Sequence, residues 1–109
     1  RGLLDHATAD ADSYDMRRLE CSDSFLHKNE SFKNREIEKF FNQEVRPVLG
    51  ALKGQVFGGN DFGRSGDLTT YWFAEEVSKT QLAVRLIVEI KNAPFEQQQL
   101  FNDYVTDRT

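Results

Sequence analysis

The sequence predicts one small α+β domain: a helix, a three-stranded and mainly antiparallel sheet with a long hairpin, and a C-terminal helix. Three patterns carry this prediction. Apolar residues recur every three or four positions across residues 37–52, which is typical of a helix. Segments 68–75 and 81–91 are rich in β-branched and aromatic residues and flank a short connection, which predicts an antiparallel hairpin. Segment 94–105 returns to helical spacing.

The first thirty residues are predicted to form a loosely ordered arm, which leaves residues 31–109 as the single α+β domain. Segment 5–15, DHATADADSYD, is polar, acidic and poor in large aliphatic residues. Segment 16–27 has scattered apolar positions, and its pattern is compatible with a short helix or with an edge strand.

The first helix is predicted to begin at Asn29 or Ser31, either of which can cap it, and to end before Gly54. Pro47 interrupts the helical pattern. Because proline lacks an N–H group and its ring clashes with the preceding turn, the helix should kink or divide near Arg46. The apolar positions of this helix are Ile37, Phe40, Phe41, Val45, Val48, Leu49 and Leu52.

The three strands and the last helix follow. A short strand is expected at 55–57, before a glycine-rich loop that leads into the hairpin. The second hairpin strand should end at Asn92 and Pro94, and Pro94 also suits the first turn of the last helix. The buried side of that helix would consist of Phe95, Leu100, Phe101, Tyr104 and Val105.

Composition narrows the class of protein. The chain has 109 residues and a net charge of −4, which disfavours tight, free-standing nucleic-acid binding because that depends on neutralising phosphates. A bound metal ion can still supply the local positive charge that a nuclease needs.

Cys21 is the only cysteine, so no internal disulfide is possible, and we expect a reducing, cytoplasmic compartment. No apolar run approaches the length of a transmembrane helix, so no membrane partner is expected.

The end of the long hairpin carries the residues from which a chemical function can be argued. Glu89 and Lys91 are two positions apart on one strand, which puts them on the same face. Asp67 begins the preceding strand. Two neighbouring carboxylates repel each other unless a cation lies between them, and Mg²⁺ prefers such oxygen ligands and also binds phosphate. With Lys91 orienting water or stabilising negative charge, this set has the chemistry for metal-assisted phosphodiester hydrolysis.

Whether the two carboxylates meet depends on the register of the hairpin. If Glu75 pairs with Gln81, Asp67 lies opposite Glu89, with about 5 Å between their Cβ atoms. A slip of one residue would separate them and would put Tyr71 on the apolar face. The sequence leaves both registers open.

Glu44 is a further acidic candidate. Phe40 and Val48 lie one turn to either side of it on the apolar stripe of the first helix. A carboxylate on that stripe needs a partner or a metal. The alternative is that Glu44 reaches the rim of the core or pairs with an arginine.

This arrangement resembles the PD-(D/E)XK nuclease superfamily across roughly residues 36–105. The superfamily has an acidic residue at the start of one strand, here matched by Asp67, and Glu/Asp-x-Lys at the end of the next, here matched by Glu89-Ile90-Lys91. The segments RSGDL and LIVEIKNAP are most similar to the N-terminal nuclease domains of restriction-enzyme subunits. Gly66 stands where the superfamily has a proline.

The resemblance implies a Mg²⁺-dependent endonuclease domain, either active or an inactive relative. Asp67, Glu89 and the helical Glu44 would hold the metal, and Lys91 and Gln99 would assist the reaction. Gln99 and Tyr104 resemble the glutamine and tyrosine that several branches carry on the helix after the lysine, at a spacing that differs by one residue.

A non-catalytic protein-binding module is the second class that the sequence supports. The small size, the acidic charge and the aromatic segment 71–73 suit an acidic adaptor or a secretion-chaperone-like subunit that dimerises through its sheet. Glu89 and Lys91 would then form a solvated strand end. Segment 54–59, GQVFGG, also resembles the first hairpin of cystatin-type protease inhibitors, which would imply insertion into a protease cleft. The expected partners are therefore another protein, a second copy of the chain, or nucleic acid.

Overall fold

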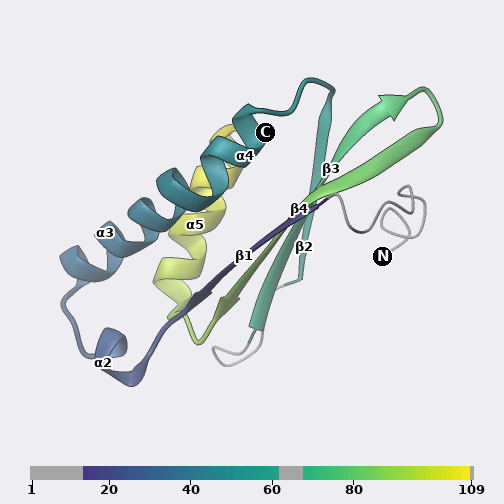
Figure 1. The fold of residues 1–109 in the computed structure, drawn as a ribbon. Coiled ribbons are helices and arrows are strands. Elements are labelled where there is room, and N and C mark those ends of the chain that lie inside the picture. Colours follow the sequence, from purple (N-terminus) through teal and green to yellow (C-terminus); the bar gives the residue numbers. More distant parts are fainter. Residues whose placement is uncertain (1–13, 62–67, 109) are drawn as a thin grey trace.

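The computed structural model describes residues 14–61 and 68–108, and it has an α+β fold with one mixed four-stranded sheet and a C-terminal helix (Figure 1). The strands lie in the order β1-β4-β3-β2; β1 is parallel to β4, and the other neighbours are antiparallel. In chain order the elements are β1 (Asp15–Glu20), α2 (Asp23–Leu26), α3 (Glu30–Phe40), the π-helix η2 (Phe41–Val45), α4 (Arg46–Gly50), β2 (Val56–Asp61), β3 (Leu68–Ser78), β4 (Gln81–Lys91) and α5 (Phe95–Arg108).

The α+β class, the long hairpin and the C-terminal helix are confirmed, but the prediction of three strands was one strand short. The additional strand, β1, lies in the segment that we assigned to a loosely ordered arm. It pairs with β4 from Asp15 opposite Leu86 to Glu20 opposite Lys91, and the Cys21 N–H continues the pairing to the Lys91 carbonyl at 2.9 Å. Residues 1–13 of the predicted arm lie outside the described residues.

The first helical region divides at Arg46, as Pro47 predicted. Asn29 caps α3, with its Oδ1 accepting a hydrogen bond from the Phe32 N–H at 2.8 Å. Before the proline, one π turn widens the helix, and the Arg46 N–H donates to the Phe41 carbonyl five residues back. This turn takes up the strain that a ring without an N–H group introduces, so α4 continues after it.

The hairpin adopts neither of the two registers that the sequence left open. Glu75 lies opposite Ala83, whereas Gln81 lies opposite Ser78. The pairing shifts twice, between Phe73 and Ala74 and between Glu76 and Ser78, so no single register describes the whole hairpin. An extra residue in one strand turns the following side chains over, and a sequence pattern with a period of two does not reveal this.

The core lies between one face of the sheet and the helices, which Figure 1 shows side by side on that face. Phe101 of α5 is at its centre: its ring centroid is 4.9 Å from that of Tyr71 and 5.9 Å from those of Phe40 and Phe41. Such aromatic pairs add about 0.5–1.5 kcal/mol each to the burial of their area. Among the described residues, no helix is both long and apolar enough to cross a membrane.

Candidate functional site

Glu89 and Lys91 lie on the face of the sheet that points away from the helices. Their neighbours on β4, Val88 and Ile90, are fully buried in the core, so the alternation of the strand turns Glu89 and Lys91 to the other side. Glu89 has only a 20% exposed side chain and is 3.5 Å from the Arg18 guanidinium of β1. This carboxylate already has a positive partner.

Asp67, the proposed companion of Glu89, lies outside the described residues. The first residue of β3, Leu68, lies opposite Lys91, and Thr70 is the residue opposite Glu89. The predicted meeting of the Asp67 and Glu89 carboxylates therefore stays a prediction.

Glu44 and Gln99, the two candidate site residues on helices, lie apart from Glu89. Glu44 is exposed on η2 and forms an ion pair with Arg17 at 3.2 Å. Because Arg17 and Arg18 are consecutive on β1, they point to opposite faces, and Glu44 and Glu89 are separated by the sheet. Gln99 is exposed on α5, which also packs on the helix-covered face.

The sheet thus prevents Glu44 or Gln99 from sharing a metal ion with Glu89. Within residues 14–61 and 68–108, no group of three or more His, Cys, Asp or Glu side chains is arranged to hold a metal. Tyr104, which the nuclease resemblance pairs with Gln99, stacks on Phe41 with 5.4 Å between ring centroids. Its ring therefore packs against the hydrophobic core.

We call the side of the sheet opposite the helices the open face. The register sets its members: Met16, Arg18 and Glu20 of β1; Val84, Ile87, Glu89 and Lys91 of β4; Leu68, Thr70, Trp72 and Ala74 of β3; and Phe57, Gly59 and Asp61 of β2. Met16 is 50% exposed and Leu68 is 40% exposed. In the part of the chain that the structure describes, the helices all lie on the opposite side (Figure 1).

An apolar row crosses the centre of the open face. Met16, Ile87, Trp72 and Gly59 are successive cross-strand neighbours on β1, β4, β3 and β2. The indole of Trp72 lies against the backbone of Gly59, because a Cβ atom at position 59 would come within 2.5 Å of the indole Cε2. Glycine at this position therefore lets a large aromatic ring lie flat on the sheet.

A polar row lies beside the apolar row, nearer one end of the strands. It consists of Arg18, Glu89, Thr70 and Asp61, in the same strand order. Arg18 is 3.8 Å from Glu20 as well as 3.5 Å from Glu89, so it neutralises part of the negative charge at this end. The row begins with a cation on the β1 edge and ends with an anion on the β2 edge.

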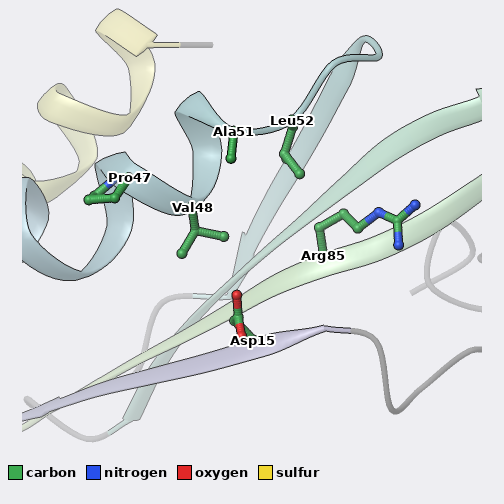
Figure 2. Close-up of a pocket in the computed structure, with 6 residues that line it drawn as sticks. All are labelled: Asp15, Pro47, Val48, Ala51, Leu52 and Arg85. Atoms are coloured by element: carbon green, nitrogen blue, oxygen red, sulfur yellow. The ribbon is translucent and has the colours of Figure 1, made fainter.

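A separate hollow lies between α4 and the helix-covered side of the sheet. Figure 2 shows that Val48, Ala51 and Leu52 point from the helical segment toward the strands. The hollow has a volume of about 360 Å³ and is lined by Asp15, Pro47, Val48, Ala51, Leu52 and Arg85. Its size is in the range of small-molecule pockets, but its one cation, Arg85, is already paired with Glu75.

Glu75 is the partner of Arg85 beside this hollow. Its Oε1 accepts a hydrogen bond from Arg85 Nε at 2.9 Å, and its Oε2 accepts hydrogen bonds from the N–H groups of Lys53 and Gly54 at 2.8 and 2.7 Å. The Gly54 and Lys53 N–H groups, followed by Arg85, hold the pKa of Glu75 below its ordinary value. These contacts join the hairpin to the segment after α4, so we assign them a structural role.

The residues of the apolar row did not stand out as a site in the sequence. A signal was nevertheless present, because the segments 71–73 and 86–88 are apolar at consecutive positions. Such strands have apolar residues on both faces in any register. Comparison with protein-family models, curated proteins and solved structures finds no match for this chain.

Proposed function

We propose that this domain is a non-catalytic protein-binding module and that the open face is its docking surface. The observation that carries the proposal is the apolar character of both faces of the central strands, in segments 71–73 and 86–88. Strands of this kind are typical of sheets that are covered on both sides. Among the described residues, helices cover one side alone.

The arrangement of side chains on the open face supports this proposal. Trp72 and Ile87 are partly exposed at its centre, and tryptophan is enriched among the residues that dominate binding energy in interfaces. Arg18, Thr70 and Glu89 form a polar border on one side. An apolar centre with a polar rim is the usual anatomy of a protein interface.

Cys21 supports a role without covalent catalysis. Its side chain is 2% exposed, and burial raises the pKa of its thiol to about 11. At neutral pH the thiol is therefore protonated and shielded, whereas nucleophilic cysteines need the thiolate form.

Co-purification from cells of the source organism tests the proposal. The wild type is compared with Ile87→Lys, which puts a charge on the open face, and with Gln99→Lys, which adds the same charge to an exposed position on α5. Circular dichroism verifies that all three fold. We expect a stoichiometric partner, or a second copy of the chain, that the wild type and Gln99→Lys retain and Ile87→Lys loses. Equal retention by all three proteins, or no partner at all, would contradict the proposal.

A metal-dependent nuclease is a second candidate, and one observation favours it. Glu89 and Lys91 share a face at the end of β4, as the Glu-x-Lys motif of the nuclease resemblance requires. In this proposal Asp67 and Glu89 alone would hold Mg²⁺, and the metal would compete with Arg18 for Glu89.

A titration with Mg²⁺ and Mn²⁺ by NMR, on the wild type and Asp67→Asn, tests the nuclease candidate. Saturable shifts at Asp67, Glu89 and Lys91 that vanish in the variant would support it and would justify cleavage assays. Metal-independent spectra of the folded protein would contradict it.

A further inference from the structure

On the basis of the proposed function, we infer that the partner of the open face is a second copy of this chain. The two sheets would pack face to face and leave the helices on the outside. Sheets that pack in this way lie about 10 Å apart, with their strands nearly aligned. A two-fold rotation determines which rows of the open face meet in such a pair.

The rotation axis runs parallel to the strands, in the plane between the two sheets, above the boundary of β3 and β4. With the observed strand order, this operation puts β4 of one copy opposite β3 of the other and β1 opposite β2. Each cross-strand row of one copy then meets the same row of its partner in reverse order. A face is self-complementary in this arrangement if the two halves of each row fit each other.

The apolar row meets this condition. Ile87 of each copy comes opposite Trp72 of the other, and Met16 comes opposite Gly59, where the indole lies. A half-exposed, unbranched methionine thus faces the surface of an aromatic ring, a contact that is favourable for its sulfur. The side chains of Met16, Ile87 and Trp72 from both copies, six in all, would form the dry centre of the interface.

The polar row meets the same condition through charge. Arg18 of each copy comes opposite Asp61 of the other, and Glu89 comes opposite Thr70. The interface therefore contains two Arg18–Asp61 pairs, one at each edge, and no pair of like charges within this row. Arg18 and Asp61 lie at opposite ends of the same row, so the surface is complementary in charge to its own rotated copy. We therefore favour a second copy over an unrelated protein as the partner.

Sedimentation equilibrium of the purified full chain, over a range of concentrations, tests the inference. We expect twice the mass of one chain at high concentration for the wild type. Arg18→Glu or Asp61→Lys puts like charges opposite each other at both edges, and each should weaken the dimer roughly tenfold or more. The double variant Arg18→Glu/Asp61→Lys restores opposite charges and should regain most of the affinity. Asp61 is exposed at the sheet edge, so its replacement remains informative if Arg18→Glu disturbs β1.

Trp72 is the only tryptophan, and its fluorescence reports on the open face directly. Quenching by iodide should decrease as the concentration of the wild type rises, and it should stay constant in the monomeric variants. A chain that remains monomeric with Trp72 accessible at all concentrations would overturn the inference. The proposed function would survive that result if Ile87→Lys still lost a different partner. A dimer that is indifferent to Ile87→Lys and to both charge reversals uses another surface and would also overturn the inference.

Discussion

Replacement of Glu75 with glutamine tests how the hairpin is joined to the segment that follows α4. Glu75 accepts hydrogen bonds from Lys53 N–H, Gly54 N–H and Arg85 Nε, all between 2.7 and 2.9 Å. Glutamine has the same shape, but one of its terminal atoms is a donor. If the amide NH2 of the glutamine takes the place of Oε1, it faces the Arg85 Nε–H donor and that hydrogen bond is lost. If it takes the place of Oε2, it faces the Lys53 and Gly54 N–H donors and those two hydrogen bonds are lost.

We expect Glu75→Gln to lower the free energy of unfolding by about 2–3 kcal/mol. A hydrogen bond to a charged group contributes roughly 1.5–3 kcal/mol, and the retained bonds become weaker neutral ones. The side chains of Glu75 and Arg85 are 13% and 29% exposed, so water replaces the lost partner only in part. Glu76→Gln is the matched control, since Glu76 is exposed and should change stability by no more than about 0.5 kcal/mol.

The effect should depend on pH with a defined sign. The pKa of Glu75 in the folded protein is below its ordinary value of 4.5, chiefly because of the Gly54 and Lys53 N–H groups. Ionised Glu75 therefore stabilises the fold fully above that ordinary value, and the stabilisation is lost as the pH falls through the lowered folded pKa. The difference between the wild type and Glu75→Gln should be largest at neutral pH and should shrink in acid.

Urea denaturation, followed by Trp72 fluorescence and by circular dichroism, measures this difference. With an m value of about 1.5 kcal/mol/M, the midpoint of Glu75→Gln should fall by about 1.3–2 M at neutral pH. A midpoint equal to that of Glu76→Gln would show that the hydrogen bonds of Glu75 do not stabilise the fold. A difference that persisted unchanged in acid would show that the charge of Glu75 is not its source.

Three further predictions concern the open face and the core. Gly59→Ala should push the Trp72 indole off the sheet, which should shift its fluorescence emission to the red and lower the free energy of unfolding by about 1–3 kcal/mol. An unchanged emission spectrum would contradict the packing of the indole against Gly59. Cys21, with a pKa of about 11, should react with iodoacetamide much more slowly in the folded protein than in urea; equal rates would show that its burial is transient. Burial raises the pKa of Tyr71 to about 12, so stability should fall as the pH rises above 10, and Tyr71→Phe should flatten that decrease in alkaline urea titrations.

Elements with local signals could be predicted from the sequence alone. Asn29 caps the first helix, Pro47 divides that helix near Arg46, and the hairpin between residues 68 and 91 follows from its β-branched and aromatic content. A cap, a proline and a strand pattern act on their immediate neighbours, so their effects can be predicted without the rest of the fold. For the same reason, the placement of Glu89 and Lys91 on one face was correct.

How these elements combine depends on contacts between residues that are far apart in the sequence. β1 has a weak pattern of its own, and it becomes a strand because the edge of β4 offers hydrogen-bond partners. The register depends on an extra residue in β4, Arg85, which lies between two paired positions and turns the side chains over. The sheet then separates Glu44 from Glu89, although both are acidic candidates in the sequence.

The open face was decided in the same way. The sequence indicates that segments 71–73 and 86–88 have apolar residues on both faces, but it does not tell which face the helices cover. Packing Tyr71 and Phe73 against Phe101 buries one face in the core and turns Trp72 and Ile87 outward. The physical reason is that a strand presents alternate side chains to opposite sides, and only long-range packing determines which side becomes the core.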